Sequence, residues 1–191
     1  MNIGIYIYEH AEVLDFAGPF EVFSVAKRLH CADWNITLIA ATEQQVPTKG
    51  NFQVVPHHTI NDHPLLDLLV VPGGIHTYEM EKPEILQWLR QTDQTTKHTA
   101  SVCTGVFLLA NAGILNTQTV TTHWDDLNEL KERFPTLDVV SDTRWVNQGK
   151  YTTSGGISAG IDMSLGLVER FTTKQQAEAV ARQMEYVWEH K

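Results

Sequence analysis

A nearly continuous apolar run, Leu66–Val71 (LDLLVV), constrains the fold of this chain more than any other feature. The run stops at Pro72-Gly73-Gly74, residues that end a strand in a tight turn. An apolar run of this length between turn signals is typical of a strand buried on both faces. Such strands occur almost only in parallel sheets, whose crossover connections place helices on the two faces. The run therefore predicts a covered, mostly parallel sheet.

Segments typical of strands alternate with segments typical of helices along the chain. The main expected strands are Ile3–Tyr8, Trp34–Ala40, Leu66–Val71 and Thr99–Val102, with short ones at Gln53–Val55, around Thr59, and at Val120–Thr122, Leu137–Val140, Arg144–Asn147 and Tyr151–Thr153. The expected helices are Phe20–Leu29, Pro83–Arg90, the apolar run that follows Cys103-Thr104-Gly105 and is closed by Gly113, Asp125–Phe134, Ala159–Phe171, and a last helix. The last helix opens with the capping box Thr173-x-x-Gln176 and carries an apolar face from Ala177 to Trp188. This alternation predicts the α/β class.

Length and composition limit the organisation and the kind of partner. The chain has 191 residues, 42% of them hydrophobic, which is enough for one domain spanning residues 1–191. Two cysteines are too few for a disulfide framework, and their spacing matches no metal motif, so no metal is expected. The histidines His57, His58 and His63 lack accompanying ligands at metal spacing and are expected in surface loops.

The N-terminus and the charge point to a reducing cytoplasm and a small-molecule partner. Met1–Tyr8 has no cationic segment and is too short for a secretion signal, and no apolar run reaches the roughly 20 residues of a membrane helix. A net charge of −9 argues against binding nucleic acid through a basic surface. We therefore expect neither a membrane nor a nucleic-acid partner.

The stretch Lys97–Gly113 (KHTASVCTGVFLLANAG) places a cysteine between a buried strand and a helix. Backbone N–H groups and the helix dipole at such a junction favour a thiolate at Cys103. Gly105 leaves room for the sharp turn of a nucleophile elbow. The alternative is that Cys103 is only a small buried apolar residue.

Chemically capable residues gather in the loops that leave the expected strands. In a parallel sheet these loops share the carboxyl edge, where ligands bind. They are Glu9–Gly18, Pro72–His76, Cys103–Gly105, His123-Trp124 and Ser154–Gly160. Together they supply a thiol, the carboxylate of Asp15, the imidazole of His123 and glycine N–H groups suited to an oxyanion hole. Each has a structural alternative: Asp15 as a helix cap, His123 as a packed side chain, and the glycines as turns.

Five motifs in this order resemble the ThiJ/PfpI superfamily, within it the isocyanide hydratase branch and the amidotransferase-like ligand domains of AraC-type regulators. The motifs are LDFAGPFEVF (Leu14–Phe23), VVPGG (Val70–Gly74), SVCTG (Ser101–Gly105), TTHW (Thr121–Trp124) and TSGGISAGID (Thr153–Asp162). The resemblance covers nearly the whole chain. It implies a flavodoxin-like three-layer α/β sandwich with a cysteine nucleophile elbow, and a homodimer.

The resemblance also assigns roles by position. It implies that Cys103 is the nucleophile, that Asp15 faces it and handles protons, and that Thr104 lies beside the reacting centre. Residues implied to supply backbone donors or to border and shape the pocket are Gly73, Gly74, Ile75, His123, Trp124, Gly156 and Ile157.

The implied activity is the hydration of a small electrophile without a metal or organic cofactor. Attack of Cys103 on an isocyanide would give a thioimidate, and water would release an N-substituted formamide. Thr104 stands where protease-like members carry histidine, and Asp15 stands for the glutamate of glyoxalase and deglycase members, so both activities are disfavoured. The chain ends at Lys191, before any helix-turn-helix region of a complete regulator. A non-catalytic ligand or oxidant sensor and a glyoxalase or deglycase remain the alternatives.

Overall fold

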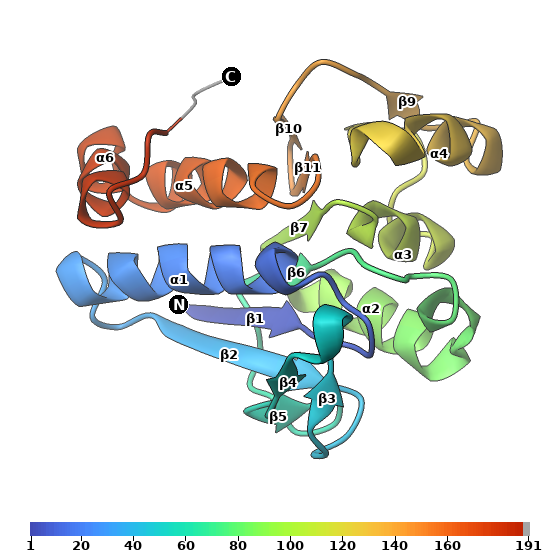
Figure 1. Ribbon diagram of the computed structural model, residues 1–191, viewed down its shortest axis with the longest axis horizontal. Helices are drawn as coiled ribbons and strands as arrows, with labels where there is room; N and C mark the ends of the chain where they lie inside the picture. The colour runs from blue at the N-terminus through green and yellow to red at the C-terminus, as the bar shows by residue number, and fades with distance from the viewer. Residues whose placement is uncertain (189–191) are drawn as a thin grey trace.

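A seven-stranded sheet forms the centre of the computed structural model, which describes residues 1–188 (Figure 1). The strand order is β10-β11-β7-β6-β1-β2-β5. These strands are β1 (Asn2–Tyr6), β2 (Asn35–Ala40), β5 (His58–Thr59), β6 (Leu68–Val71), β7 (His98–Val102), β10 (Trp145–Gln148) and β11 (Tyr151–Ser154). All pairs are parallel except β10 with β11, an antiparallel hairpin. The predicted mostly parallel sheet is confirmed.

Helices cover both faces of this sheet and complete a flavodoxin-like three-layer sandwich (Figure 1). One layer holds α1 (Val13–Leu29), α5 (Ala159–Phe171) and α6 (Lys174–Gln183), which pack against one another. The other holds α2 (Pro83–Thr95) and α3 (Gly105–Asn111), with α4 (Leu127–Arg133) beyond them. All four residues of β6 are buried, as the run Leu66–Val71 predicts.

Small elements complete the chain outside the main sheet. Two antiparallel strands, β3 (Val46–Pro47) and β4 (Gln53–Val54), form a hairpin, and β8 (Thr119–Val120) pairs in parallel with β9 (Asp138–Val139). Single 3-10 turns lie at Lys49–Asn51, Glu79–Glu81 and Trp124–Asp126. The predicted strands at Val120–Thr122 and Leu137–Val140 therefore exist in shortened form, but as a separate pair.

Three helix boundaries differ most from the prediction. Helix α2 continues to Thr95, past its expected end at Arg90. Helix α1 begins at Val13, not at Phe20, and Pro19 lies inside it. Phe16, Pro19 and Phe23 are buried at helical spacing, so packing on the sheet outweighs the proline and places Asp15 in the first turn of a helix rather than in a loop. Helix α6 has the expected Thr173 cap, but it ends at Gln183. Val187 is 85% exposed and does not join the apolar face. Trp188 lies past the helix but still packs against the core, as predicted.

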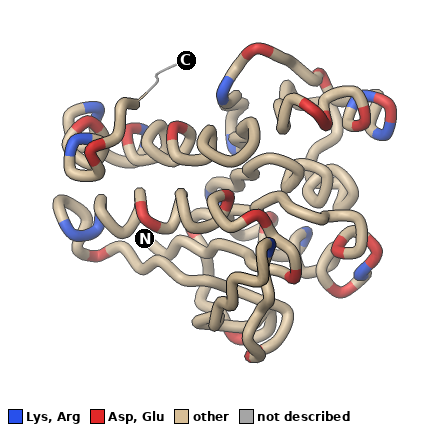
Figure 2. Tube along the Cα trace, viewed as in Figure 1, with Lys and Arg blue, Asp and Glu red and all other residues tan. Residues whose placement is uncertain are grey.

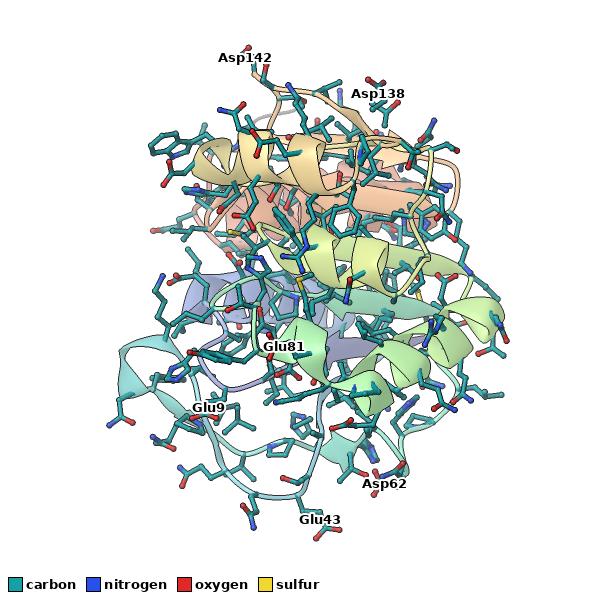
Figure 3. The ribbon with its side chains drawn as sticks, turned by 90° about the vertical axis from the view of Figure 1, so that its right-hand side faces the viewer. Glu9, Glu43, Asp62, Glu81, Asp138 and Asp142 are labelled. Carbon is teal, nitrogen blue, oxygen red and sulfur yellow. The ribbon has the colours of Figure 1, made fainter. Side chains whose placement is uncertain are left out.

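Charged residues are spread over the surface. Basic segments are interspersed with acidic ones over residues 1–188 (Figure 2). Asp138 and Asp142 lie at one end of the molecule and Glu43 and Asp62 at the other (Figure 3). No helix within residues 1–188 is long and apolar enough to cross a lipid bilayer.

The connections change direction between β1 and β6. The chain leaves β1 through α1 toward β2, and it leaves β6 through α2, on the opposite face, toward β7. Neighbouring strands whose crossovers diverge open a crevice at their carboxyl ends, which is where ligands bind in open α/β sheets. The residues that follow β1, β6 and β7 therefore meet at this edge.

Candidate active site

Cys103 occupies the strained turn between β7 and α3. Its φ of 55° lies in the left-handed region, which non-glycine residues adopt only where the surroundings hold them there. Its N–H donates to the carbonyl oxygens of Ser154 (3.1 Å) and Gly155 (3.3 Å), and its own carbonyl accepts from Thr122 Oγ1 at 2.9 Å. The neighbouring β11 and the segment after β8 thus fix the turn. The predicted elbow is present.

Asp15 connects three of the edge loops in the core of the site. Its side chain is fully buried. Oδ2 accepts from the Gly73 N–H at 3.0 Å, and Oδ1 accepts from the Ile157 N–H at 3.1 Å. The Cys103 thiol lies beside this carboxyl group, near enough for each group to affect the pKa of the other. The helix start, the turn after β6 and the turn before α5 are therefore held together around the sulfur.

Burial governs the ionisation of this pair. Loss of water raises the pKa of Asp15 to about 7, although the N–H groups of Gly73 and Ile157 oppose the shift. Burial and the adjacent Asp15 carboxylate raise the pKa of the Cys103 thiol far above its usual range, against a lowering by the Thr104 N–H. The sequence-based expectation of a resting thiolate is therefore wrong. Helix α3 spans only seven residues, and its dipole does not outweigh a buried carboxylate.

The glycine turn after β6 holds its neighbours in place. The Gly74 N–H donates to Thr104 Oγ1 at 3.0 Å, and the Thr104 hydroxyl donates to the Gly74 carbonyl oxygen at 3.1 Å. A Cβ at Gly73 would lie 2.6 Å from Thr104 Oγ1 and 2.8 Å from the Cys103 Cβ, so only glycine fits there. The N–H groups of Gly73 and Gly74, expected as donors to the reacting centre, thus already bind Asp15 and Thr104.

A pocket of about 350 Å³ opens onto the thiol. The expected residues Gly74, Thr104, His123 and Ile157 line it together with Cys103. Sequence reasoning missed four further charged residues of its wall, which are Glu12, Lys49, Asp125 and Asp126. Lys49 and Glu12 form an ion pair at 2.7 Å. Their separation along the chain left no signal, whereas Asp125 and Asp126 directly follow the TTHW motif.

His76, the last residue of the predicted edge loop Pro72–His76, also lines this pocket. It is 7% exposed, and its ring packs on Phe107 with centroids 4.6 Å apart. Burial lowers its pKa. Its neighbour Ile75, which the resemblance implied as a pocket residue, is 44% exposed and does not line the pocket at the thiol.

His123 and Gly156 lie against each other beside the sulfur. A Cβ at Gly156 would collide with the His123 ring and lie 3.2 Å from Cys103 Sγ, so the lack of a side chain lets His123 approach. His123 Nδ1 lies 3.5 Å from Asp126 Oδ2. Trp124 is 75% exposed and stacks obliquely on the His123 ring with centroids 5.5 Å apart, outside the pocket at the thiol.

The sequence profile of the DJ-1/PfpI family matches residues 1–170. The chain belongs to this family. An isonitrile hydratase of Pseudomonas putida is 31% identical over 188 residues, which cover 97% of this chain and 78% of that protein. The HTH-type transcriptional regulator CdhR of Pseudomonas aeruginosa is 28% identical over 171 residues, and the match covers 90% of this chain but 51% of that regulator.

A solved structure has the same fold. A ThiJ/PfpI family protein from Pseudomonas syringae superposes with a TM-score of 0.88 at 25% identity, and the match covers 98% of this chain and 76% of that one. The proteins similar to this chain thus include a hydratase and a transcriptional regulator that is matched over about half of its length. This division matches the two classes of function that the sequence leaves open.

Proposed function

We propose that the protein is a cysteine-dependent hydro-lyase that adds water to a small electrophile, first of all an isocyanide, and releases an N-substituted formamide. The adjacent buried pair of Cys103 and Asp15 carries this proposal. A carboxyl group whose pKa is raised to about 7 can both accept and return a proton at neutral pH. The 31% identity to an isonitrile hydratase supports the same reaction.

In the first half of the reaction, the thiol adds across the terminal carbon of the isocyanide. The Asp15 carboxylate takes the proton from Cys103 Sγ, and the sulfur forms the new S–C bond. Protonated Asp15 then gives its proton to the same carbon. The product is a thioimidate in which carbon is bonded to sulfur, to hydrogen and, doubly, to nitrogen. The overall change is the insertion of one carbon into the S–H bond.

In the second half, water adds to the thioimidate. Asp15, again a carboxylate, takes a proton from the attacking water, and the imine nitrogen receives a proton as the C–O bond forms. The tetrahedral species collapses by breaking the S–C bond, and the proton returns to sulfur. The formamide leaves and the thiol is restored. Every proton comes from the water, the thiol or Asp15.

The hydrogen bonds of the turn favour this chemistry over peptide hydrolysis. Acyl transfer develops a full oxyanion and needs open N–H donors. Here the N–H groups of Gly73, Gly74 and Ile157 already donate to Asp15 and Thr104. Addition of a thiol to an isocyanide forms no oxyanion, so an engaged turn is no obstacle to it.

A sensor domain is the second candidate, because about half of the transcriptional regulator CdhR is similar to this chain. Such a domain would bind a ligand at the same pocket without turnover. A raised thiol pKa slows direct oxidation, which makes an oxidant sensor the weaker form of this alternative.

The deciding experiment measures formamide formation from methyl isocyanide by the purified protein and by Cys103→Ala and Asp15→Asn. We expect turnover by the wild-type protein, none by Cys103→Ala, and a loss of about 10²–10⁴-fold in Asp15→Asn. Asp67→Asn, at a carboxylate paired with Lys97 far from the thiol, is the matched control and should keep full activity. Absence of turnover with a reduced Cys103 would refute the hydratase proposal.

We further propose a cytoplasmic homodimer. Leu14 and Ile157 are exposed by 37% and 41% beside the site, on α1 and before α5, and they offer an apolar surface for a second copy. Sedimentation equilibrium tests the dimer: the wild-type protein should have the mass of two chains, and Leu14→Glu should have the mass of one.

A further inference from the structure

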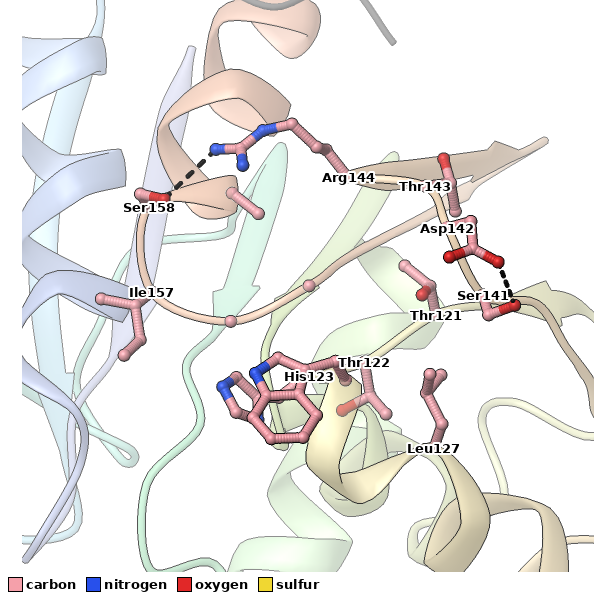
Figure 4. A pocket seen from close by; sticks show the side chains of 14 residues that line it. Thr121, Thr122, His123, Leu127, Ser141, Asp142, Thr143, Arg144, Ile157 and Ser158 are labelled. Atoms are coloured by element: carbon pink, nitrogen blue, oxygen red, sulfur yellow. Dashed lines mark hydrogen bonds between the residues drawn. The ribbon is translucent and has the colours of Figure 1, made fainter.

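A second pocket, of about 500 Å³, lies next to the pocket at the thiol (Figure 4). Its walls come from the segment after β8, the segment before β10 and the turn into α5. Arg144 and Ser158 lie on one side of it in Figure 4, and His123 and Leu127 lie on the other. A short substrate such as methyl isocyanide would leave this space empty.

Two residues line both pockets. His123 and Ile157 line both pockets. Gly156 lines the second pocket, and a Cβ atom added to it would lie 3.2 Å from Cys103 Sγ. The second pocket therefore begins within one residue of the sulfur. A substrate carbon held at Cys103 would direct its substituent along His123 into this space.

The two pockets carry a surplus of negative charge. Each basic side chain in their walls is matched by a carboxylate: Lys49 pairs with Glu12 at 2.7 Å, and Arg144 pairs with the buried Asp162 at 2.5 Å. Three acidic residues add to these pairs, and they are Asp125, Asp126 and Asp142. His123 Nδ1 approaches Asp126, and Asp142 accepts from the Ser141 hydroxyl, which carries no charge.

The apolar part of the second pocket is formed by Trp124, Leu127 and Ile157. Trp124 is 75% exposed, so its ring is accessible to a ligand. An aromatic face attracts both alkyl groups and cations. Shape and charge therefore favour the same class of ligand.

We propose that the second pocket binds the N-substituent of the substrate, and that this substituent is uncharged or cationic and not a carboxylate. The inference rests on the proposed function for the identity of the reacting group. It goes beyond it by naming the substituent class and the residues that select it. Asp142 repels an anion, and Trp124 packs against an alkyl or trimethylammonio group.

Binding of product-like formamides tests this without turnover. One matched pair is N-(2-carbamoylethyl)formamide and N-(2-carboxyethyl)formamide, and the other is N-(3,3-dimethylbutyl)formamide and its trimethylammonio isostere. Dissociation constants come from ¹H–¹⁵N shift titrations of the full chain, which also report on Gly156 and the Trp124 indole. We expect the carboxylate to bind roughly tenfold or more weakly than its amide, and the cation at least as tightly as its neutral isostere.

Two pairs of variants locate the effect. Asp142→Asn should reduce the ratio of the carboxylate's dissociation constant to that of its amide by about threefold. Asp138→Asn removes the same charge from a nearby exposed position outside the pocket and should leave this ratio unchanged. Ser141→Trp fills the pocket from its rim and should weaken the binding of the larger formamides relative to that of N-methylformamide. Thr136→Trp, also exposed but outside the pocket, should not.

Equal binding of amide and carboxylate, equal effects of the two asparagine variants, or no shift at Gly156 and Trp124 with any formamide would overturn the inference. If the expected order of binding is found but methyl isocyanide is not hydrated, the pocket assignment stands and the proposed reaction falls. The two failures are therefore distinct.

Discussion

The ionisation of Asp15 should make the stability of the protein depend on pH in a defined way. Its pKa of about 7 in the folded state exceeds the reference value of 3.8 by about three units, and each unit corresponds to 1.36 kcal/mol. The folded state therefore loses about 4 kcal/mol of stability from this one carboxyl group as it ionises. That amount is a large fraction of the 5–15 kcal/mol typical of a whole domain.

The sign follows from which state holds the proton. Between pH 4 and pH 7 the unfolded chain has lost the Asp15 proton, while the folded protein keeps it. The contribution of Asp15 to the free energy of unfolding is fully present below pH 4, falls as pH rises through this window, and levels off above pH 7. Asparagine cannot ionise, so Asp15→Asn should remove the slope. The variant also leaves one N–H of Gly73 or Ile157 less well bonded, a cost that does not change with pH.

Urea unfolding of both proteins at half-unit steps from pH 4 to pH 8 measures the difference. All other titrating groups cancel in the comparison, so the free energy of unfolding of Asp15→Asn minus that of the wild type should rise by about 4 kcal/mol across the window. Asp67→Asn is the flat control. Lys97 and the Asn2 N–H lower the pKa of Asp67, so the stability that Asp67 contributes is lost only below pH 4, and this variant should run nearly parallel to the wild type from pH 4 to pH 8. Parallel curves for Asp15→Asn and wild type would refute the buried, proton-holding carboxyl.

Three further predictions concern the thiol. The rate of formamide formation should rise with pH through an apparent pKa near 7, set by the first ionisation of the Asp15–Cys103 pair, and a rate independent of pH from 5 to 8 would contradict this. Alkylation of Cys103 by iodoacetamide at pH 7 should be slow and should accelerate in Asp15→Asn, since the adjacent carboxylate raises the thiol pKa; mass spectrometry of the labelled peptide measures it. Gly156→Ala should displace the His123 ring and reduce kcat/KM by at least about tenfold, with the far-UV circular dichroism unchanged.

The position of the nucleophile was predictable because its signals are local. A buried strand, a cysteine and a glycine within five residues indicate the turn at Cys103, and the structure shows that turn. The run Leu66–Val71 indicated its strand for the same reason. The start of α1 was not predictable in this way, because Gly18-Pro19 looks like a helix start, and only packing of Phe16 on the sheet shows otherwise.

Charge contacts between distant segments escaped prediction for a different reason. The ion pair of Glu12 and Lys49 joins residues with no periodic relation in the chain. The pKa of Cys103 depends on the carboxylate of Asp15, which is far from Cys103 in the sequence. A local rule about helix dipoles therefore gave the wrong direction for the shift of the thiol pKa. A thiol pKa belongs to its three-dimensional surroundings, and those require the fold.

The same surroundings restrict the chemistry in a consistent manner. Asp15 and Cys103 share a buried site in which two negative charges would repel strongly, so the pair favours steps that move one proton and keep one charge at most. Addition of a thiol to a neutral electrophile is such a step, whereas attack on an anionic substrate would bring a further negative charge to the pair. The acidic wall formed by Asp125, Asp126 and Asp142 excludes anions for the same reason, at a greater distance from the sulfur. The proton chemistry at the thiol and the charge of the pockets thus select the same neutral or cationic substrates.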